Sequence, residues 1–112
     1  LKGLKPSTRQ RFVSMRFDFP GAEREISILI GETGCDADLA KRLVGIAKAF
    51  RALKDRDLEE VASTRLLVYA ATLIKSGFDV SAACRAALVE SLTDDEETVE
   101  ALMEIVNATF GR

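Results

Sequence analysis

The chain has 112 residues, of which 47% are hydrophobic and 30% are charged, and its formal net charge is −2. This length suits one small globular domain, and the mildly acidic charge gives no general reason to expect binding to nucleic acid or to an anionic membrane. No histidine is present, which excludes a Ser-His-Asp triad and a Cys-His nucleophile, and Cys35 and Cys84 lack the spacing of a zinc site. No signal peptide or run of about twenty apolar residues is found, so we expect a cytoplasmic protein without membrane insertion.

The first twenty residues combine a basic opening with one predicted strand. The stretch "RFVSMRFDF", residues 11–19, alternates between the two faces of a strand and ends at Pro20-Gly21. Because a lone strand is not stable in water, its partners must lie in another domain or chain. Since the chain also starts with leucine, we expect a piece of a longer protein.

Helical periodicity predicts the rest of the chain, beginning with two amphipathic helices. The first covers 22–32, with acids in its first turn and Gly34 as its C-terminal stop. The second follows an Asp36 N-cap and continues to about residue 53, with apolar residues at helical spacing. Basic residues fall mainly on its other face: Lys41, Arg42, Lys48 and Arg51.

Three further helices are predicted after a polar turn. One spans 64–76 and ends at Gly77, and a short one through residue 92 can be capped by Asp79 or Ser81. The last begins at a Thr93-x-x-Glu96 capping box and continues through residue 110. The acidic run at its start is explained by the helix dipole without a metal ion. The predicted fold is therefore mainly α, a bundle of about five helices over 21–112 preceded by one strand in 1–20.

Arg65 occupies an unusual place in this pattern. It lies in the first turn of the helix that begins with Ser63 and Thr64, where the backbone N–H groups and the dipole are already positive. One interpretation is a surface arginine whose head reaches water or an acid such as Glu59 or Glu60. The other is an anion site, in which the N–H groups, the guanidinium and both hydroxyls hold a phosphate.

A second pair of arginines lies near the N-terminus. In "STRQRF", Arg9 and Arg11 are separated by one residue immediately before the predicted strand. A solvated basic loop is the simpler interpretation. If this segment meets a neighbouring subunit, an arginine could instead reach a nucleotide phosphate in trans and stabilise charge during phosphoryl transfer.

Four blocks in this order resemble the C-terminal part of the CbbQ/NirQ/NorQ group of MoxR-type AAA+ ATPases. They are "STRQRFVSMRFDFP", "EREISILIGETG", "STRLLVYAATLIKSG" and "AACRAALVESLTDDEE", and together they cover essentially the whole chain. The resemblance implies that residues 1–20 are the last helix turn and strand of an α/β ATPase domain. It implies that residues 21–112 form the helical lid over the nucleotide.

The same resemblance implies functional residues and partners. Arg65, with Ser63 and Thr64, corresponds to the family's sensor-2 position, and Arg11, or alternatively Arg9, corresponds to its arginine finger. The longer protein is expected to bind ATP and magnesium, to form a ring hexamer, and to work with a von Willebrand A-domain partner. It would then remodel and activate a client enzyme, either nitric oxide reductase or rubisco.

One departure limits what this chain can do by itself. It contains neither a Walker A lysine in its motif nor Walker B acids, so any ATP hydrolysis belongs to the longer protein. A different class of function also stays open: a free-standing helical module that docks other proteins and has no nucleotide role. A nucleic-acid-binding bundle ranks last, because the chain is acidic and its basic arm lacks interleaved aromatic residues.

Overall fold

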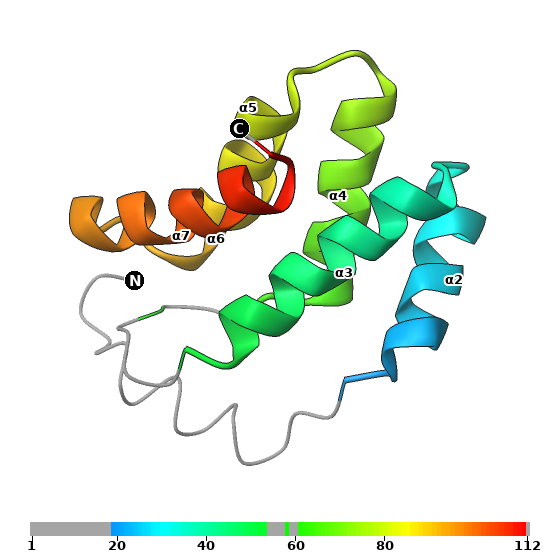
Figure 1. Ribbon diagram of the computed structural model, residues 1–112, viewed down its shortest axis with the longest axis horizontal. Helices are drawn as coiled ribbons and strands as arrows, with labels where there is room; N and C mark the ends of the chain where they lie inside the picture. The colour runs from blue at the N-terminus through cyan, green and yellow to red at the C-terminus, as the bar shows by residue number, and fades with distance from the viewer. Residues whose placement is uncertain (1–18, 54–57, 59–60, 112) are drawn as a thin grey trace.

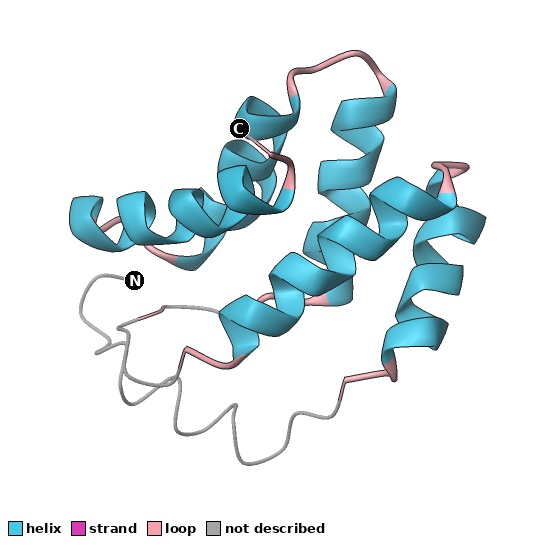
Figure 2. Cartoon of the chain, viewed as in Figure 1, coloured by secondary structure: helices cyan, strands magenta, loops and turns pink. Residues whose placement is uncertain are grey.

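A computed structural model describes residues 19–53, 58 and 61–111 of the chain. Within these residues the structure is helical and contains no strand (Figures 1 and 2). The predicted strand lies outside the described residues except for Phe19, which belongs to neither a helix nor a strand. The mainly α fold and its five helical segments are confirmed, whereas the strand stays a prediction.

The first two helices form as their end signals predict. Helix α2, Ala22–Thr33, ends at Gly34, whose φ of 74° places it in the left-handed region and whose N–H donates to the Ile30 carbonyl at 2.8 Å. Helix α3, Ala37–Arg51, begins at Asp36, whose side chain accepts a hydrogen bond from the Leu39 N–H at 2.8 Å.

Helix α4, Thr64–Lys75, is followed by a longer helical run with an irregular middle. The run comprises α5, Val80–Cys84, the π-helical segment η1, Arg85–Val89, and α6, Glu90–Leu92. Asp79 provides the N-cap, accepting from the Ala82 N–H at 3.1 Å. In η1 the Glu90 N–H donates to the carbonyl of Arg85, five residues earlier.

The last helix, α7, covers Glu96–Thr109 and does not begin at the predicted capping box. Its N-cap is Asp95, whose carboxylate accepts from the Thr98 N–H at 3.0 Å and from the Thr98 hydroxyl at 2.8 Å. The Thr93 hydroxyl accepts instead from the Asp95 N–H at 3.1 Å. The prediction of a Thr93–Glu96 capping box is therefore wrong. The carboxylate of Asp95, two residues nearer the helix than Thr93, is the N-cap instead.

Helices α3 and α4 lie at the centre of the described structure and contact most of the other helices. Helix α3 packs against α2, α4 and α7, and α4 packs against α2, α3, α5 and η1 (Figure 1). Cys84 lies in this core, and burial raises the pKa of its thiol to about 12. Large side chains from every helix fill the interior, among them Leu29, Leu43, Ile46, Phe50, Leu67, Leu88, Leu92, Leu102 and Val106.

Two kinds of feature are absent from the described residues: a membrane-spanning helix and a group of metal ligands. None of their helices is long and apolar enough to cross a membrane. In the same part of the chain, no three cysteine, aspartate or glutamate side chains gather closely enough to hold a metal ion.

Candidate functional site

The start of helix α4 carries the three residues that the sequence assigned to a phosphate site. Ser63 is extended and forms the N-cap, with its Oγ accepting from the Leu66 N–H at 3.4 Å. Thr64 and Arg65 are consequently the first two helical residues, and N–H groups of a first turn have no acceptor inside the helix. An anion placed here would meet the positive end of the helix.

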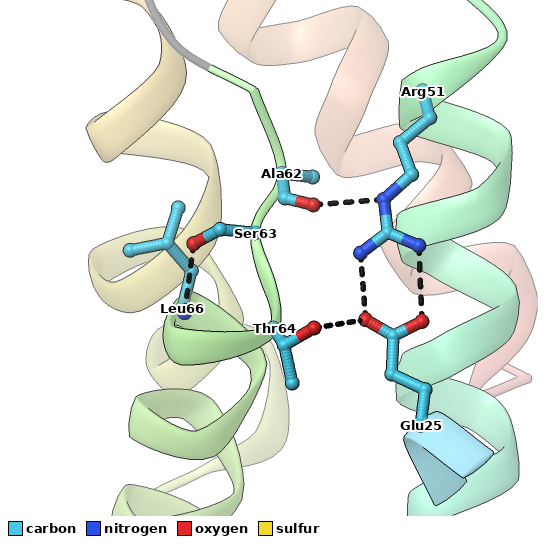
Figure 3. Close-up of polar contacts among 6 residues, drawn as sticks. All are labelled: Glu25, Arg51, Ala62, Ser63, Thr64 and Leu66. Carbon is cyan, nitrogen blue, oxygen red and sulfur yellow. Dashed lines mark hydrogen bonds and ion pairs between the residues drawn. The ribbon is translucent and has the colours of Figure 1, made fainter. Parts of the chain in front are cut away.

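A buried carboxylate lies directly beside this helix start (Figure 3). Glu25, in the first turn of α2, is only 1% exposed. Its oxygens accept from Nη1 and Nη2 of Arg51 at 3.0 and 2.7 Å, and Oε2 also accepts from the Thr64 hydroxyl at 2.7 Å. One carboxylate thus joins α2, α3 and α4.

Arg51, the last residue of α3, connects the carboxylate to the segment before α4. Its Nε donates to the Ala62 carbonyl at 2.8 Å, and its Cζ lies 3.6 Å from the centroid of the Phe19 ring. We call Glu25, Arg51, Ala62 and Thr64 the Glu25 cluster. Although Arg51 was predicted to fall mainly on the face opposite the apolar one, its side chain is only 13% exposed and turns inward to this cluster.

The pKa of Glu25 reports the balance of forces in the Glu25 cluster. Burial by itself would raise this pKa, because it disfavours the charged form. Hydrogen bonds from Arg51 and Thr64, together with the positive charge of Arg51, outweigh burial and lower the pKa below the usual value for glutamate. Glu25 is therefore a carboxylate at neutral pH, and the ion pair is fully formed.

The three predicted site residues differ in how far their side chains are already engaged. The Thr64 hydroxyl donates to Glu25, and the Ser63 hydroxyl accepts from the helix backbone. Arg65 is exposed, and no residue that the structure describes pairs with its guanidinium. Among the three, Arg65 is thus the side chain without a partner in the described part of the chain, and Ser63 and Thr64 shape the helix start.

The other predicted site residues cannot be placed. Arg9 and Arg11, the candidates for an arginine finger, lie outside the described residues, and so do Glu59 and Glu60, the acids suggested as partners of Arg65. The structure neither brings these side chains to the start of α4 nor separates them from it.

Sequence reasoning missed the Glu25 cluster, although a signal was present. Glu25 precedes the fully buried Leu29 by four residues, and Arg51 follows the fully buried Ala47 by four. Residues four apart share a helix face, so an acid and a base each continue a buried stripe. Oppositely charged residues in such positions on two neighbouring helices indicate a buried pair.

The fold and the site together define a helical domain in which a buried ion pair supports an arginine-bearing helix start. The chain belongs to the CbbQ/NirQ/NorQ family, because the family model described as CbbQ/NirQ/NorQ C-terminal matches residues 25–109. This match begins at Glu25 itself and includes every helix from α3 to α7.

Curated relatives agree with this assignment. The chain is 62% identical over 107 residues to the denitrification regulatory protein NirQ of Pseudomonas aeruginosa, covering 96% of the chain and 41% of the relative. It is 51% identical to the protein NorQ of Paracoccus denitrificans over 99% of the chain and 41% of that protein. It is 46% identical to the protein CbbQ of Hydrogenophilus thermoluteolus over 98% of the chain and 41% of that protein. The chain thus spans about two fifths of the length of these relatives.

Proposed function

We propose that this chain is the nucleotide-facing helical lid of an ATP-driven activator, and that Arg65 binds a phosphate of ATP in the full-length protein. The observation that carries the proposal is the start of α4. An exposed guanidinium stands there at the positive end of a helix whose first residue is tied to a buried ion pair. The helix end and the guanidinium act on the same anion, and a bidentate fork matches phosphate oxygens.

ATP and magnesium would be held mainly by groups outside this chain. The residues described fit a supporting role, because Arg65 offers charge without offering a metal ligand or a general base. Tyr69 follows Arg65 by one helical turn and leaves 54% of its surface exposed. An exposed ring beside an exposed guanidinium suits a face that is covered by another domain in the complete protein.

The names of the relatives support a biological role for the full-length protein. Relatives carry the names denitrification regulatory protein, NorQ and CbbQ. We propose that the full-length protein remodels and activates a client enzyme, nitric oxide reductase or rubisco, together with a von Willebrand A-domain partner in the cytoplasm. Co-purification of the full-length protein with either client tests this role, and capture of neither would contradict it.

We also propose that Arg11, or alternatively Arg9, acts as an arginine finger between subunits of a ring hexamer. A finger acts on the nucleotide of the neighbouring subunit, so one mutant subunit disables a site that is not its own. Mixing Arg11→Ala subunits with subunits that lack the Walker A lysine should therefore restore part of the ATP turnover, because an Arg11→Ala site can receive an intact finger from its neighbour. No restoration for either arginine would contradict a finger that acts between subunits.

The proposed role of Arg65 is tested by ATP turnover of the full-length protein. Loss of a hydrogen-bonded charge costs about 1.5–3 kcal/mol, so Arg65→Ala should lower kcat/KM by about tenfold to hundredfold. Arg65→Lys keeps the positive charge but lacks the planar fork of two N–H donors, so its kcat/KM should lie between those of the wild type and of Arg65→Ala. The matched control is Arg85→Ala, since Arg85 is an exposed arginine whose ion pair with Glu90 is half exposed on both sides.

The control defines which result counts against the proposal. Because exposed ion pairs contribute little stability, Arg85→Ala should leave both turnover and the helical circular dichroism spectrum unchanged. Equal turnover for Arg65→Ala and Arg85→Ala would contradict a phosphate-binding role and favour the protein-docking alternative.

A further inference from the structure

The Glu25 cluster is built differently from the other ion pairs that the structure describes. Arg42–Asp38 and Arg85–Glu90 each join residues of one helical run and are 41% to 74% exposed. Glu25 and Arg51 come from different helices and are almost completely buried. An exposed pair contributes little, whereas a buried pair commits both helices to one arrangement.

The Glu25 cluster forms hydrogen bonds with the chain on both sides of the α4 N-cap. Arg51 holds the carbonyl of Ala62, the residue before Ser63, and Glu25 holds the hydroxyl of Thr64, the residue after it. Figure 3 shows both contacts converging on the same guanidinium and carboxylate pair. Two fixed points flanking one residue determine where α4 begins and also how it is rotated about its axis.

The rotation determines the direction of Arg65. Successive residues of an α-helix are turned by about 100°, since there are 3.6 residues in a turn. With the Thr64 side chain held inward against Glu25, the side chain of the next residue leaves the helix about 100° around the axis from that contact. This agrees with the exposure of Arg65. The buried pair therefore selects the orientation in which the arginine is available to an anion.

Stability alone does not account for a charged pair at this place. Replacing a buried ion pair by well-packed apolar residues is often neutral or stabilising, so the pair gives the fold no evident advantage over a hydrophobic contact. A bidentate pair with two further hydrogen bonds provides a defined geometry that apolar side chains do not.

We propose that Glu25 and Arg51 are positioning residues for Arg65, acting through Thr64 and Ala62 to place its guanidinium for phosphate binding. This inference rests on the proposed nucleotide role of Arg65. Neither Glu25 nor Arg51 touches the nucleotide, and their effect on ATP hydrolysis passes through the start of α4.

The experiment is a double-mutant cycle in the full-length protein. Arg51→Lys keeps the charge but cannot hold Glu25 and Ala62 with a planar fork, and Thr64→Val removes the hydroxyl with little change of shape. Each is measured with and without Arg65→Ala. Arg85→Lys is the matched control, because it makes the same substitution at an exposed ion pair.

The expected result is strong coupling. A displacement of about 1 Å at a positioned group can cost as much as a hundredfold in rate, so Arg51→Lys and Thr64→Val should each lower kcat/KM by about tenfold or more. In the Arg65→Ala background the same substitutions should have almost no further effect, since the group that they position is gone. Arg85→Lys should leave kcat/KM unchanged in both backgrounds.

A second measurement does not depend on the nucleotide. Amide hydrogen exchange reports local opening, and Arg51→Lys and Thr64→Val should speed exchange at Leu66 and Leu67, in the first turn of α4. Exchange at Leu102, in α7, should stay as in wild type. This outcome also shows that both variants are folded.

The possible outcomes separate the positioning role from the proposed function. If Arg65→Ala leaves turnover unchanged, the nucleotide role and the positioning inference both fail. If Arg65→Ala lowers turnover but the losses from Arg51→Lys add fully to it, the nucleotide role stands and positioning is wrong. Unchanged exchange at the start of α4 in both variants would also overturn the positioning role.

Discussion

At Glu25, burial and hydrogen bonding act in opposite directions on one carboxyl group. Burial raises its pKa, but the donors of Arg51 and Thr64 and the charge of Arg51 lower it further than burial raises it. The folded-state pKa is therefore depressed relative to the unfolded chain. The ionised pair stabilises the fold, and that contribution depends on pH.

The first prediction concerns this pH dependence. A depressed pKa contributes stability that is complete above the unfolded-state pKa of glutamate, about 4.3, and is lost as pH falls through the lower folded-state pKa. At pH 7, Glu25→Gln should lower the free energy of unfolding by about 3 kcal/mol, because Arg51 is left without its counter-charge. Denaturant unfolding at several pH values measures the difference.

The control for Glu25 lies in the same helical turn. Glu23 is exposed, so Glu23→Gln should change the free energy of unfolding by at most about 0.5 kcal/mol. The deficit of Glu25→Gln should shrink as pH falls below about 4, since protonated Glu25 resembles glutamine. A deficit that stays constant from pH 7 to pH 3 would contradict an ionised pair.

At the scale of elements, the sequence predicts helix ends well where one residue has a clear role. Gly34 and Asp36 end α2 and start α3 as expected, because a left-handed glycine and a capping carboxylate act through local geometry. The predicted N-cap at Thr93 was wrong because Asp95 takes the N-cap position of α7 instead. The π-helical segment Arg85–Val89 carries no comparable local signal, since its apolar spacing is also that of an α-helix.

The corrected cap of α7 gives a prediction at this scale. Asp95→Ala should lower the free energy of unfolding by about 1 kcal/mol, the usual contribution of an N-cap. Glu96→Ala should cost only a few tenths of a kcal/mol, because Glu96 acts on the helix dipole alone. Thermal unfolding of the two variants measures both values. A larger loss for Glu96→Ala than for Asp95→Ala would restore the capping box.

At the scale of the whole molecule, local patterns mark Glu25 and Arg51 as charges on buried stripes but do not pair them. Glu25 and Arg51 are 26 residues apart, and Glu25 and Thr64 are 39 apart, so their contacts require the packing of three helices. Arg65 was recognised because a cation at a helix N-terminus conflicts with the dipole. Glu25 and Arg51, which support it through Thr64 and Ala62, were missed because their pairing depends on how α2 and α3 pack.

The packing of the helices also supports the end of α4 that carries Arg65. Helix α4 lies against α2, α3, α5 and η1 (Figure 1), and the Glu25 cluster ties its N-terminal end to α2 and α3. A rigidly supported arginine loses little freedom when it binds an anion. On the proposed nucleotide role, the domain as a whole would present one guanidinium to a nucleotide held elsewhere in the full-length protein.

The most direct measurement is a structure of the full-length protein with a non-hydrolysable ATP analogue. We predict a nitrogen of the Arg65 guanidinium about 2.7–2.9 Å from a phosphate oxygen, with the Glu25–Arg51 pair intact beside it. An Arg65 side chain that faces solvent while the nucleotide is bound in a closed site would contradict the phosphate-binding role of Arg65.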